Sequence, residues 1–274
     1  MFKSITPISF DKPLYRVETN DGQFVLKFSD RLHESDFLDI LSKDPECNPY
    51  IVCMFKSFEI SHNQVYQITQ GHIGPPRERP IVRRYIEGKL TEVNIFHPSD
   101  KYTGILLEAM DGDIKHLKNL GIFRKYNQEI IRLLIFGLLG LAYIHSKNIC
   151  HQDIFEDNIL YKQTPKGLVY KLADFGEACG EPVAACSDLE DNKIEDIKSL
   201  GEVVFDMMTG KLFREDDDIE YRNKFINKFK IPKECSSNLI IVFEIVKDMV
   251  LSKETDAEKI LKTLDSKSIN INSR

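Results

Sequence analysis

His151 to Gly176 reads HQDIFEDNILYKQTPKGLVYKLADFG, and its polar residues fall at the ends of two apolar runs. Asp153 and Asn158 precede the first run, and Asp174 ends the second. The segment between the runs, 163–167, has the composition of a turn. The stretch therefore predicts a loop, two strands joined by a turn, and a carboxylate where the second strand ends.

Two carboxylates and one amide thus come to one edge of the predicted hairpin. All three offer hard oxygen ligands, the type that Mg²⁺ takes when it binds together with the phosphates of a nucleotide. A carboxylate at this edge can also accept the proton of a substrate hydroxyl group. The combination favours phosphoryl transfer over the alternative, a solvated loop that carries Asp and Asn beside an unrelated turn.

The pattern resembles the catalytic and metal-binding loops of the protein kinase family, in which H-R-D, four residues and N are followed later by D-F-G. The matching residues are His151-Gln152-Asp153, Asn158 and Asp174-Phe175-Gly176. The resemblance implies ATP and Mg²⁺ as cofactors. It makes Asp153 the catalytic residue that orients the attacking hydroxyl group and accepts its proton. Asn158 and Asp174 become the metal ligands.

A second match lies near the N-terminus, where Leu14 to Phe28 reads LYRVETNDGQFVLKF. Apolar and polar residues alternate on both sides of Asn20-Asp21-Gly22, which predicts a β-hairpin with a tight turn. The second strand resembles the family's V-A-I-K strand, whose Lys holds the α- and β-phosphates. The resemblance assigns Lys27 to the phosphates, as a second catalytic residue, and Val25 to the adenine.

A short helix is expected from His33 to Leu41, with its apolar residues on one face. In the family this helix supplies the Glu that pairs with the strand lysine. Asp39 stands at about the expected distance before the run Asn48 to Val52, which resembles the family's H-P-N-I-V. Glu34 is the alternative partner for the lysine.

Tyr102 to Met110, YTGILLEAM, is an apolar run that resembles the family's fifth strand and hinge. The resemblance implies that backbone groups of Glu108 and Met110 bind the adenine edge and that Asp113 reaches the ribose. Leu160 is the remaining residue that it assigns to the nucleotide.

The second half of the chain predicts a helical lobe. Ile130 to His145 predicts a long buried helix, and Asp196 to Val204 resembles the family's D-x-W-S-x-G-V helix, whose Asp ties it to the backbone of the catalytic loop. Further helices are expected over Asn238 to Met249 and over Ala257 to Leu264. Earlier in the chain, Val65 to Thr69 is expected to be a strand.

Composition limits the class of partner. The 274 residues carry a formal net charge of −6, which does not suggest nucleic-acid binding. No apolar run is long enough to span a membrane, and the first residues lack a signal-peptide h-region. The cysteines are scattered, without a CxxC pair, and are expected to be free thiols in a reducing compartment, the cytoplasm. They are Cys47, Cys53, Cys150, Cys179, Cys186 and Cys235.

These features together indicate an α+β, bilobal, protein-kinase-like fold. Residues 1–110 are expected to form a small β-rich N-lobe that ends at a hinge near Met110, and residues 111–274 a larger helical C-lobe, with ATP between them. The expected activity is that of an ATP-dependent phosphotransferase, a Ser/Thr-type protein kinase acting on a protein substrate. An activating partner or ligand is left open.

Four features depart from the family pattern. The equivalent of its glycine-rich loop, Ile8 to Pro13, contains no glycine. Gln152 replaces the Arg that binds a phosphorylated activation loop, and the segment from Glu177 to Glu195 is short and lacks A-P-E. Phe155 stands where many Ser/Thr kinases place a Lys. The chain in this respect resembles the divergent, compact kinases of bacterial effectors and viruses, for which the compartment would be the host cytoplasm.

Two other classes of protein remain open at this point. A small-molecule phosphotransferase of the aminoglycoside or choline kinase type also carries H-x-D-x-x-x-x-N and a later metal-binding Asp. Against it stand the hinge-like run and the helix that begins with Asp196. A pseudokinase that acts as a binding module would suit the missing glycines, but not the presence of Lys27, Asp153, Asn158 and Asp174.

Overall fold

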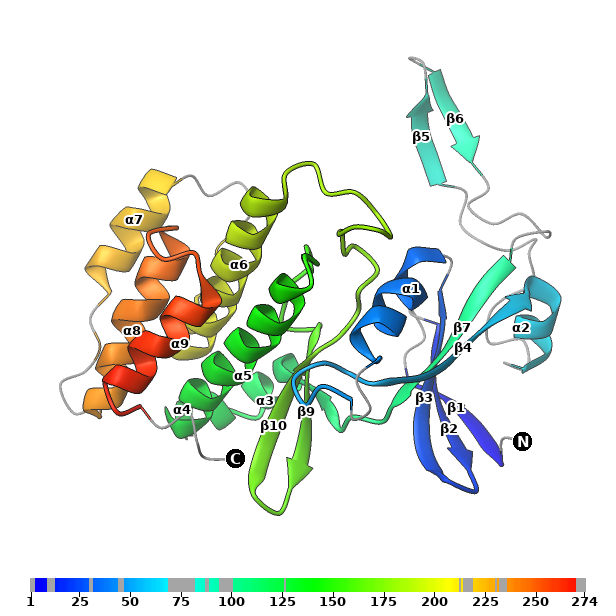
Figure 1. The fold of residues 1–274 in the computed structure, drawn as a ribbon, viewed down its shortest axis with the longest axis horizontal. Coiled ribbons are helices and arrows are strands. Elements are labelled where there is room, and N and C mark those ends of the chain that lie inside the picture. Colours follow the sequence, from blue (N-terminus) through cyan, green and yellow to red (C-terminus); the bar gives the residue numbers. More distant parts are fainter. Residues whose placement is uncertain are drawn as a thin grey trace. The chain divides into compact units, whose positions relative to one another are not determined.

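The computed structural model describes residues 3–8, 13–29, 32–43, 47–68, 82–86, 89–93, 101–125, 127–211, 213, 219–229, 231 and 236–269. The chain divides into two units (Figure 1). One comprises Met1–Ser42 and Cys53–Ala109, and the other comprises Lys43–Val52 and Met110–Arg274. The first is rich in strands and the second in helices, which confirms the prediction of an α+β, bilobal fold.

The N-terminal unit is built on a five-stranded antiparallel sheet in the order β1-β2-β3-β7-β4. β2 and β3 form the predicted hairpin, with Thr19 paired to Gly22 across the turn. Alternate side chains of the strands enter one core, as expected for a sheet with one buried face. The five strands are β1 (Ser4–Pro7), β2 (Leu14–Thr19), β3 (Gly22–Ser29), β4 (Met54–Ser61) and β7 (Lys101–Glu108). The core residues are Tyr15, Val17, Leu26, Phe28, Ile60, Val65 and Tyr102.

Helix α1 (Leu32–Leu41) forms where the sequence predicts it. It packs against β4 and β7 through its apolar face, on which Phe37, Leu38 and Leu41 are buried. Burial of this face fixes the rotation of the helix, and so decides which of its acidic residues point toward the sheet.

The predicted strand from Val65 to Thr69 is wrong, because α2 (His62–Ile68) occupies this part of the chain. Ser61 and Gln64 form a reciprocal cap at its start. The Gln64 N–H donates to the Ser61 hydroxyl group at 3.4 Å, and the Ser61 N–H donates to the Gln64 side-chain oxygen at 3.0 Å. This capping box is encoded by Ser-x-x-Gln and outweighs the strand preference of the residues that follow. Two further strands, β5 (Val82–Ile86) and β6 (Lys89–Val93), form a separate hairpin that the sequence analysis did not predict.

The C-terminal unit begins with the three-stranded sheet β10-β9-β8. β8 (Gly112–Asp113) pairs with β9 (Ile159–Thr164), which pairs in turn with β10 (Gly167–Leu172). Strands β9 and β10 are the hairpin predicted between Asn158 and Asp174, and they pair from Ile159 opposite Leu172 to Thr164 opposite Gly167. This register brings the residues just before β9 and just after β10 to the same edge.

Helices make up the rest of the C-terminal unit, and α5 contacts α6, α8, α9 and β10. Figure 1 shows α5, α6, α8 and α9 as neighbouring helices. The Asp188 side chain caps α6, which begins seven residues before the predicted Asp196 and ends at Gly210 with φ 70°. The helices are α3 (Ile114–Asn119), α4 (Ile122–Lys125), α5 (Asn127–Ser146), α6 (Leu189–Thr209), α7 (Ile219–Lys228), α8 (Ser237–Val250) and α9 (Ala257–Ser266).

Helix α5 corrects the expectation that no apolar run is long enough to span a membrane. By length and composition it could cross a membrane, although 56% of its most apolar 18-residue window is buried inside the protein. The buried residues include Leu133, Leu134, Leu138 and Leu141, all with 0% exposure. Such burial is typical of a core helix.

The cysteines correct a second expectation, since four of them are not free thiols. Cys179 and Cys186 form a disulfide, and Cys47 and Cys53 are disulfide-bonded as well. Cys150 is free and buried. Disulfide-bonded cysteines do not indicate a reducing compartment, so that compartment stays a prediction.

Candidate active site

His151 is the buried centre of the loop between α5 and β9. Its Nδ1 accepts the Asp153 N–H at 3.3 Å, and its Nε2 donates to the Ala173 carbonyl oxygen at 3.0 Å. The ring also packs on Phe175, with 4.7 Å between centroids. Burial lowers the pKa of His151, and nearby carboxylates only partly oppose this effect. A neutral ring with its proton on Nε2 satisfies both hydrogen bonds.

The Asp153 carboxylate is oriented by Asn158. The Asn158 amide nitrogen donates to Asp153 twice, to its backbone oxygen at 2.9 Å and to its carboxylate Oδ2 at 2.7 Å. Asn158 is 5% exposed, so this amide is fixed within the fold. The nitrogen faces Asp153, and the amide oxygen is the atom that can serve as a metal ligand.

Asp174 lies beside Asn158 because of the β9–β10 pairing. The Ala173 N–H donates to the Asn158 carbonyl oxygen at 2.9 Å, which joins the end of β10 to the end of the loop. Asp174 then adopts a left-handed backbone conformation with φ 66°, and Phe175 after it is fully buried. The structure therefore brings together the three residues that the sequence assigns to proton transfer and metal binding.

Asp196 on α6 holds the start of the loop. Its two carboxylate oxygens accept the N–H groups of His151 and Gln152, each at 2.8 Å. The His145 Nε2 lies 2.9 Å from the same carboxylate. Gln152 has φ 64°, a strained conformation for this residue type, and the two bonds to Asp196 compensate for it. Asp196 is thus a structural residue, as the sequence predicts.

The run from Asn48 to Val52 supports the other end of this arrangement. The Leu172 N–H donates to the Tyr50 carbonyl oxygen, and the Val52 N–H donates to the Leu172 carbonyl oxygen, both at 2.9 Å. Tyr50 also packs edge-on against Phe136 of α5. The end of β10, two residues before Asp174, therefore lies between this segment and β9.

The N-terminal unit holds the candidate phosphate-binding lysine. The Lys27 Nζ donates to Glu34 Oε1 at 2.6 Å, and the Ser29 hydroxyl group donates to Glu34 Oε2 at 2.7 Å. Glu34 is buried, whereas Asp39 is exposed. The preferred partner Asp39 was therefore wrong and the alternative, Glu34, is the acid that pairs with Lys27. The rotation of α1 decides this, because its buried apolar face carries Glu34 toward β3.

The residues assigned to the nucleoside lie in both units. In the N-terminal unit, Val25 pairs with Leu107 across β3 and β7. The Glu108 side chain accepts the Cys53 N–H at 2.8 Å, and the Glu108 N–H donates to the Cys53 carbonyl oxygen at 2.9 Å. Both bonds join Glu108 to Cys53. Binding of the adenine edge by the Glu108 backbone stays a prediction.

In the C-terminal unit, Met110 is buried and Asp113 pairs with Leu160 across β8 and β9. The Asp113 carboxylate caps α3, since its Oδ1 accepts the His116 N–H at 2.8 Å. The ribose contact assigned to Asp113 stays a prediction. Residues 9–12, which make up most of the glycine-free loop, lie outside the described residues.

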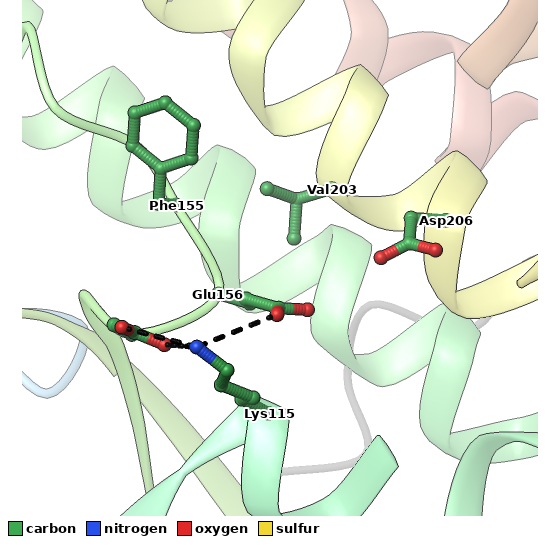
Figure 2. A pocket seen from close by; sticks show the side chains of 6 residues that line it. Lys115, Phe155, Glu156, Val203 and Asp206 are labelled. Atoms are coloured by element: carbon green, nitrogen blue, oxygen red, sulfur yellow. Dashed lines mark hydrogen bonds and ion pairs between the residues drawn. The ribbon is translucent and has the colours of Figure 1, made fainter. Parts of the chain in front are cut away.

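A pocket of about 240 Å³ lies next to the catalytic loop, and the sequence analysis did not predict it. Figure 2 shows Lys115 of α3 reaching toward Glu156. The Lys115 Nζ lies 3.9 Å from Glu156 Oε1 and 3.0 Å from Asp157 Oδ1. The acids could have been seen in the sequence, but not the helix that faces them. The residues that line the pocket are Lys115, Phe155, Glu156, Asp157, Val203 and Asp206.

Lys118 pairs with two acids of this region, Glu156 at 3.0 Å and the buried Asp206. Burial acts to lower the pKa of Lys118, but hydrogen bonds to Asp206 and Glu156 outweigh it, so the pKa is raised. The other carboxylate oxygen of Asp206, Oδ1, has no hydrogen-bond partner within the described part of the chain. The wall of the pocket carries one lysine, Lys115, and the three carboxylates of Glu156, Asp157 and Asp206, so its formal charge is negative.

Comparison with known proteins agrees with this geometry. Residues 55–184 match the family model of the protein kinase domain. A probable serine/threonine-protein kinase of Dictyostelium discoideum is 27% identical over 182 residues, which cover 56% of this chain and 21% of that protein. Protein kinase gsk3 of Schizosaccharomyces pombe is 38% identical over 88 residues, 30% of this chain and 22% of the relative. Probable serine/threonine-protein kinase HSL1 of Saccharomyces cerevisiae is 31% identical over 117 residues, 36% of this chain and 8% of the relative.

The fold and the loop geometry agree with these matches, in which residues 55–184 are similar to the protein kinase domain. The chain spans about a fifth or less of the length of these curated relatives. The protein kinase family in general uses ATP and a divalent metal ion.

Proposed function

We propose that the chain transfers the terminal phosphoryl group of ATP to a hydroxyl group of a protein substrate, as a Ser/Thr-type kinase. The observation that carries the proposal is the orientation of Asp153, whose carboxylate is held at 2.7 Å by the Asn158 amide. Asp196 fixes the preceding backbone through two further hydrogen bonds. A carboxylate held in this way can orient the attacking hydroxyl group and accept its proton.

Lys27 supplies the positive charge for the α- and β-phosphates. Its Nζ is already positioned by Glu34 at 2.6 Å, and the Lys27 side chain is 15% exposed. A lysine that is held in place loses little conformational entropy when a phosphate binds. The pair therefore supports ATP binding even though Ile8 to Pro13 contains no glycine.

Asn158 and Asp174 fit a divalent metal ion. Their side chains offer an amide oxygen and a carboxylate, which are hard ligands suited to Mg²⁺. Both residues lie at the edge where β10 ends, joined by the bond from Ala173 to Asn158. When bound, Mg²⁺ supplies charge neutralisation at the phosphates.

The activity is expected not to require phosphorylation of the activation segment. The Gln152 side chain carries no charge, and its Nε2 donates to the Asn192 carbonyl oxygen at 3.2 Å. A phosphate on the segment would not find in Gln152 the cation that the family pattern provides. The departures in sequence thus support a constitutive or partner-dependent enzyme.

The substrate class is tested by transfer from labelled ATP. Purified protein is incubated with Mg²⁺ and ATP alone, with a set of protein substrates, and with a set of small-molecule alcohols. Label on proteins is expected. Label confined to small molecules would instead indicate a phosphotransferase of the aminoglycoside or choline kinase type.

Nucleotide binding is tested separately, so that a pseudokinase can be recognised. ATP with Mg²⁺ is expected to raise the melting temperature by mass action, and Asp174→Ala is expected to remove the part of the shift that depends on Mg²⁺. Glu244→Gln, an exposed carboxylate on α8, is the control and should shift as wild type does. A clear shift with no transfer to any acceptor would indicate a binding module, and no shift at millimolar ATP would contradict the proposal.

A further inference from the structure

Three sulfur atoms gather beside the catalytic loop. The Sγ atoms of Cys150, Cys179 and Cys186 lie within 4.8 Å of one another. Cys179 and Cys186, seven residues apart, are joined in a disulfide, and Cys150 is a buried free thiol. Cys150 directly precedes His151, while Cys179 follows Asp174 by five residues. The cluster therefore joins the catalytic loop to the segment that follows the metal-binding Asp.

The backbone around the disulfide is tied to the start of the catalytic loop. Cys150 and Cys179 exchange N–H to carbonyl hydrogen bonds at 2.8 Å and 3.0 Å. Gly180 next to them has φ +155°, and a Cβ there would lie 2.4 Å from the Asn148 carbonyl oxygen. Gly180 and Ala184 pair across the loop as well. The disulfide thus closes a short loop whose base rests on residues 148–150.

The Cys179–Cys186 disulfide constrains the segment from Glu177 to Glu195, which in the family pattern is ordered by a phosphate contact. The stretch from Glu177 to Glu195 holds one hydroxyl residue, Ser187. Gln152, at the position of the phosphate-binding Arg, bonds to the Asn192 backbone through its amide. The disulfide is the covalent constraint on this segment within the described part of the chain.

We propose that Cys179–Cys186 is a reversible redox modification site that keeps the segment after Asp174 in its active conformation, so that reduction of this bond lowers kinase activity. The inference rests on the proposed function for its effect on activity, but not for its effect on the loop. A dithiol reductant transfers two electrons and two protons. The Cys179–Cys186 bond breaks to give two thiols, while a disulfide forms in the reductant. Both cysteines are half-buried, so a small reductant can reach them.

Cys150 does not take part in this exchange. Burial is the main cause that raises the pKa of Cys150 to about 12, and the neighbouring Asp196 adds to it. The thiolate is the attacking species in disulfide exchange, so Cys150 stays protonated and leaves the adjacent disulfide in place. Its Sγ instead donates to the Leu189 carbonyl oxygen at 3.6 Å.

The test compares oxidised and dithiothreitol-reduced wild type with Cys186→Ser and Cys150→Ala. Phosphoryl transfer by wild type is expected to fall at least fivefold on reduction and to return with oxidised glutathione. Cys186→Ser is expected to show the low rate in both states. Because Cys47 and Cys53 remain in this variant, it also reports any effect of their reduction. Cys150→Ala is expected to keep the response, and loss of the response there would contradict the assignment of the switch to Cys179 and Cys186 alone.

A second readout does not depend on catalysis. Elastase cleaves after small residues, and the loop offers Val183, Ala184 and Ala185. Cleavage there is expected to be at least fivefold faster in reduced wild type and in the Cys186→Ser variant. Equal cleavage of oxidised and reduced protein would overturn the proposal whether or not transfer is detected. Equal transfer rates in the two states would overturn the effect on activity. Zinc bound by all three thiols, with no disulfide formed in oxidised glutathione, would overturn it in favour of a metal site.

Discussion

Glu34→Gln is expected to destabilise the N-terminal unit by about 3 kcal/mol and to weaken ATP binding. The wild-type carboxylate is 1% exposed and accepts hydrogen bonds from the Lys27 ammonium group at 2.6 Å and from the Ser29 hydroxyl group at 2.7 Å. The substitution keeps an oxygen for Ser29 but removes the charge opposite Lys27. The variant therefore isolates the ion pair with little change in the volume of the buried side chain.

The magnitude follows from the distance and the burial of the pair. At 2.6 Å and an effective dielectric constant of about 20, the attraction is roughly 6 kcal/mol. Desolvation of the two ions offsets a large part of this attraction, and loss of one partner of a buried pair costs about 3–5 kcal/mol. The lower end applies, because Lys27 is 15% exposed and can regain some solvation.

The matched control is Asp39→Asn, the same change on the exposed side of the same helix. It is expected to alter the free energy of unfolding by less than about 0.5 kcal/mol. Because the chain contains no Trp, urea unfolding is followed by circular dichroism, and ATP binding by the shift in melting temperature. Equal effects of the two variants, or a larger effect of Asp39→Asn, would refute the pairing of Lys27 with Glu34.

Three further predictions concern the C-terminal unit. Lys118→Met leaves the buried carboxylate of Asp206 without its cation and should cost about 3 kcal/mol of stability. Lys115→Met removes an amine whose side chain is 50% exposed and should cost less than about 1 kcal/mol. If urea unfolding ranks the two variants the other way, the pairing of Lys118 with Asp206 is contradicted. Burial lowers the pKa of His151, so as the pH falls below about 6.5 this ring takes up a proton in the unfolded chain before it does so in the folded protein. The contribution of the neutral ring to stability is therefore complete above that pH and decreases below it, by at most about 1.4 kcal/mol per pH unit. His151→Gln should remove this part of the slope in unfolding measured at pH 7.5 and 5.5, and an unchanged slope would show that the ring does not carry it. Asp196→Asn replaces one of the two acceptor oxygens by a donor, so that one of the two backbone N–H groups faces a donor. The change should cost about 2–3 kcal/mol and speed hydrogen exchange of that amide, while unchanged exchange would argue against the anchoring role.

The features that the sequence predicted correctly are mostly local. The Asn20-Asp21-Gly22 turn lies between alternating strands, and the β9–β10 hairpin follows from two short apolar runs around a turn. Asp153, Asn158 and Asp174 come together because that hairpin is local, so sequence spacing and spatial position agree. Lys27 is assigned from the resemblance of its strand to the family's V-A-I-K strand, and its contact with the phosphates stays a prediction beside the observed pair with Glu34.

The features that the sequence did not predict depend on contacts between distant elements. Spacing along the chain favours Asp39 over Glu34, because spacing does not give the rotation of α1, which is set by burial of its apolar face. The Cys179–Cys186 disulfide was missed because cysteines with a spacing of seven residues form no recognised motif. Lys118 of α3 could not be paired with Asp206 before the packing of α3 and α6 was known. The strand wrongly expected at Val65 to Thr69 is the exception, since the cap formed by Ser61 and Gln64 was visible in the sequence.

The central claim is that Asp153 accepts the proton of the attacking hydroxyl group in a phosphoryl transfer. It is tested most directly by the turnover of Asp153→Asn with ATP, Mg²⁺ and the best protein substrate, beside Glu244→Gln as a control. The asparagine keeps the Lys27, Asn158 and Asp174 side chains in place, so ATP should still raise the melting temperature. The turnover of Asp153→Asn is expected to be lower by about 10²–10⁴-fold, with the control equal to wild type. Wild-type turnover in Asp153→Asn would contradict this claim.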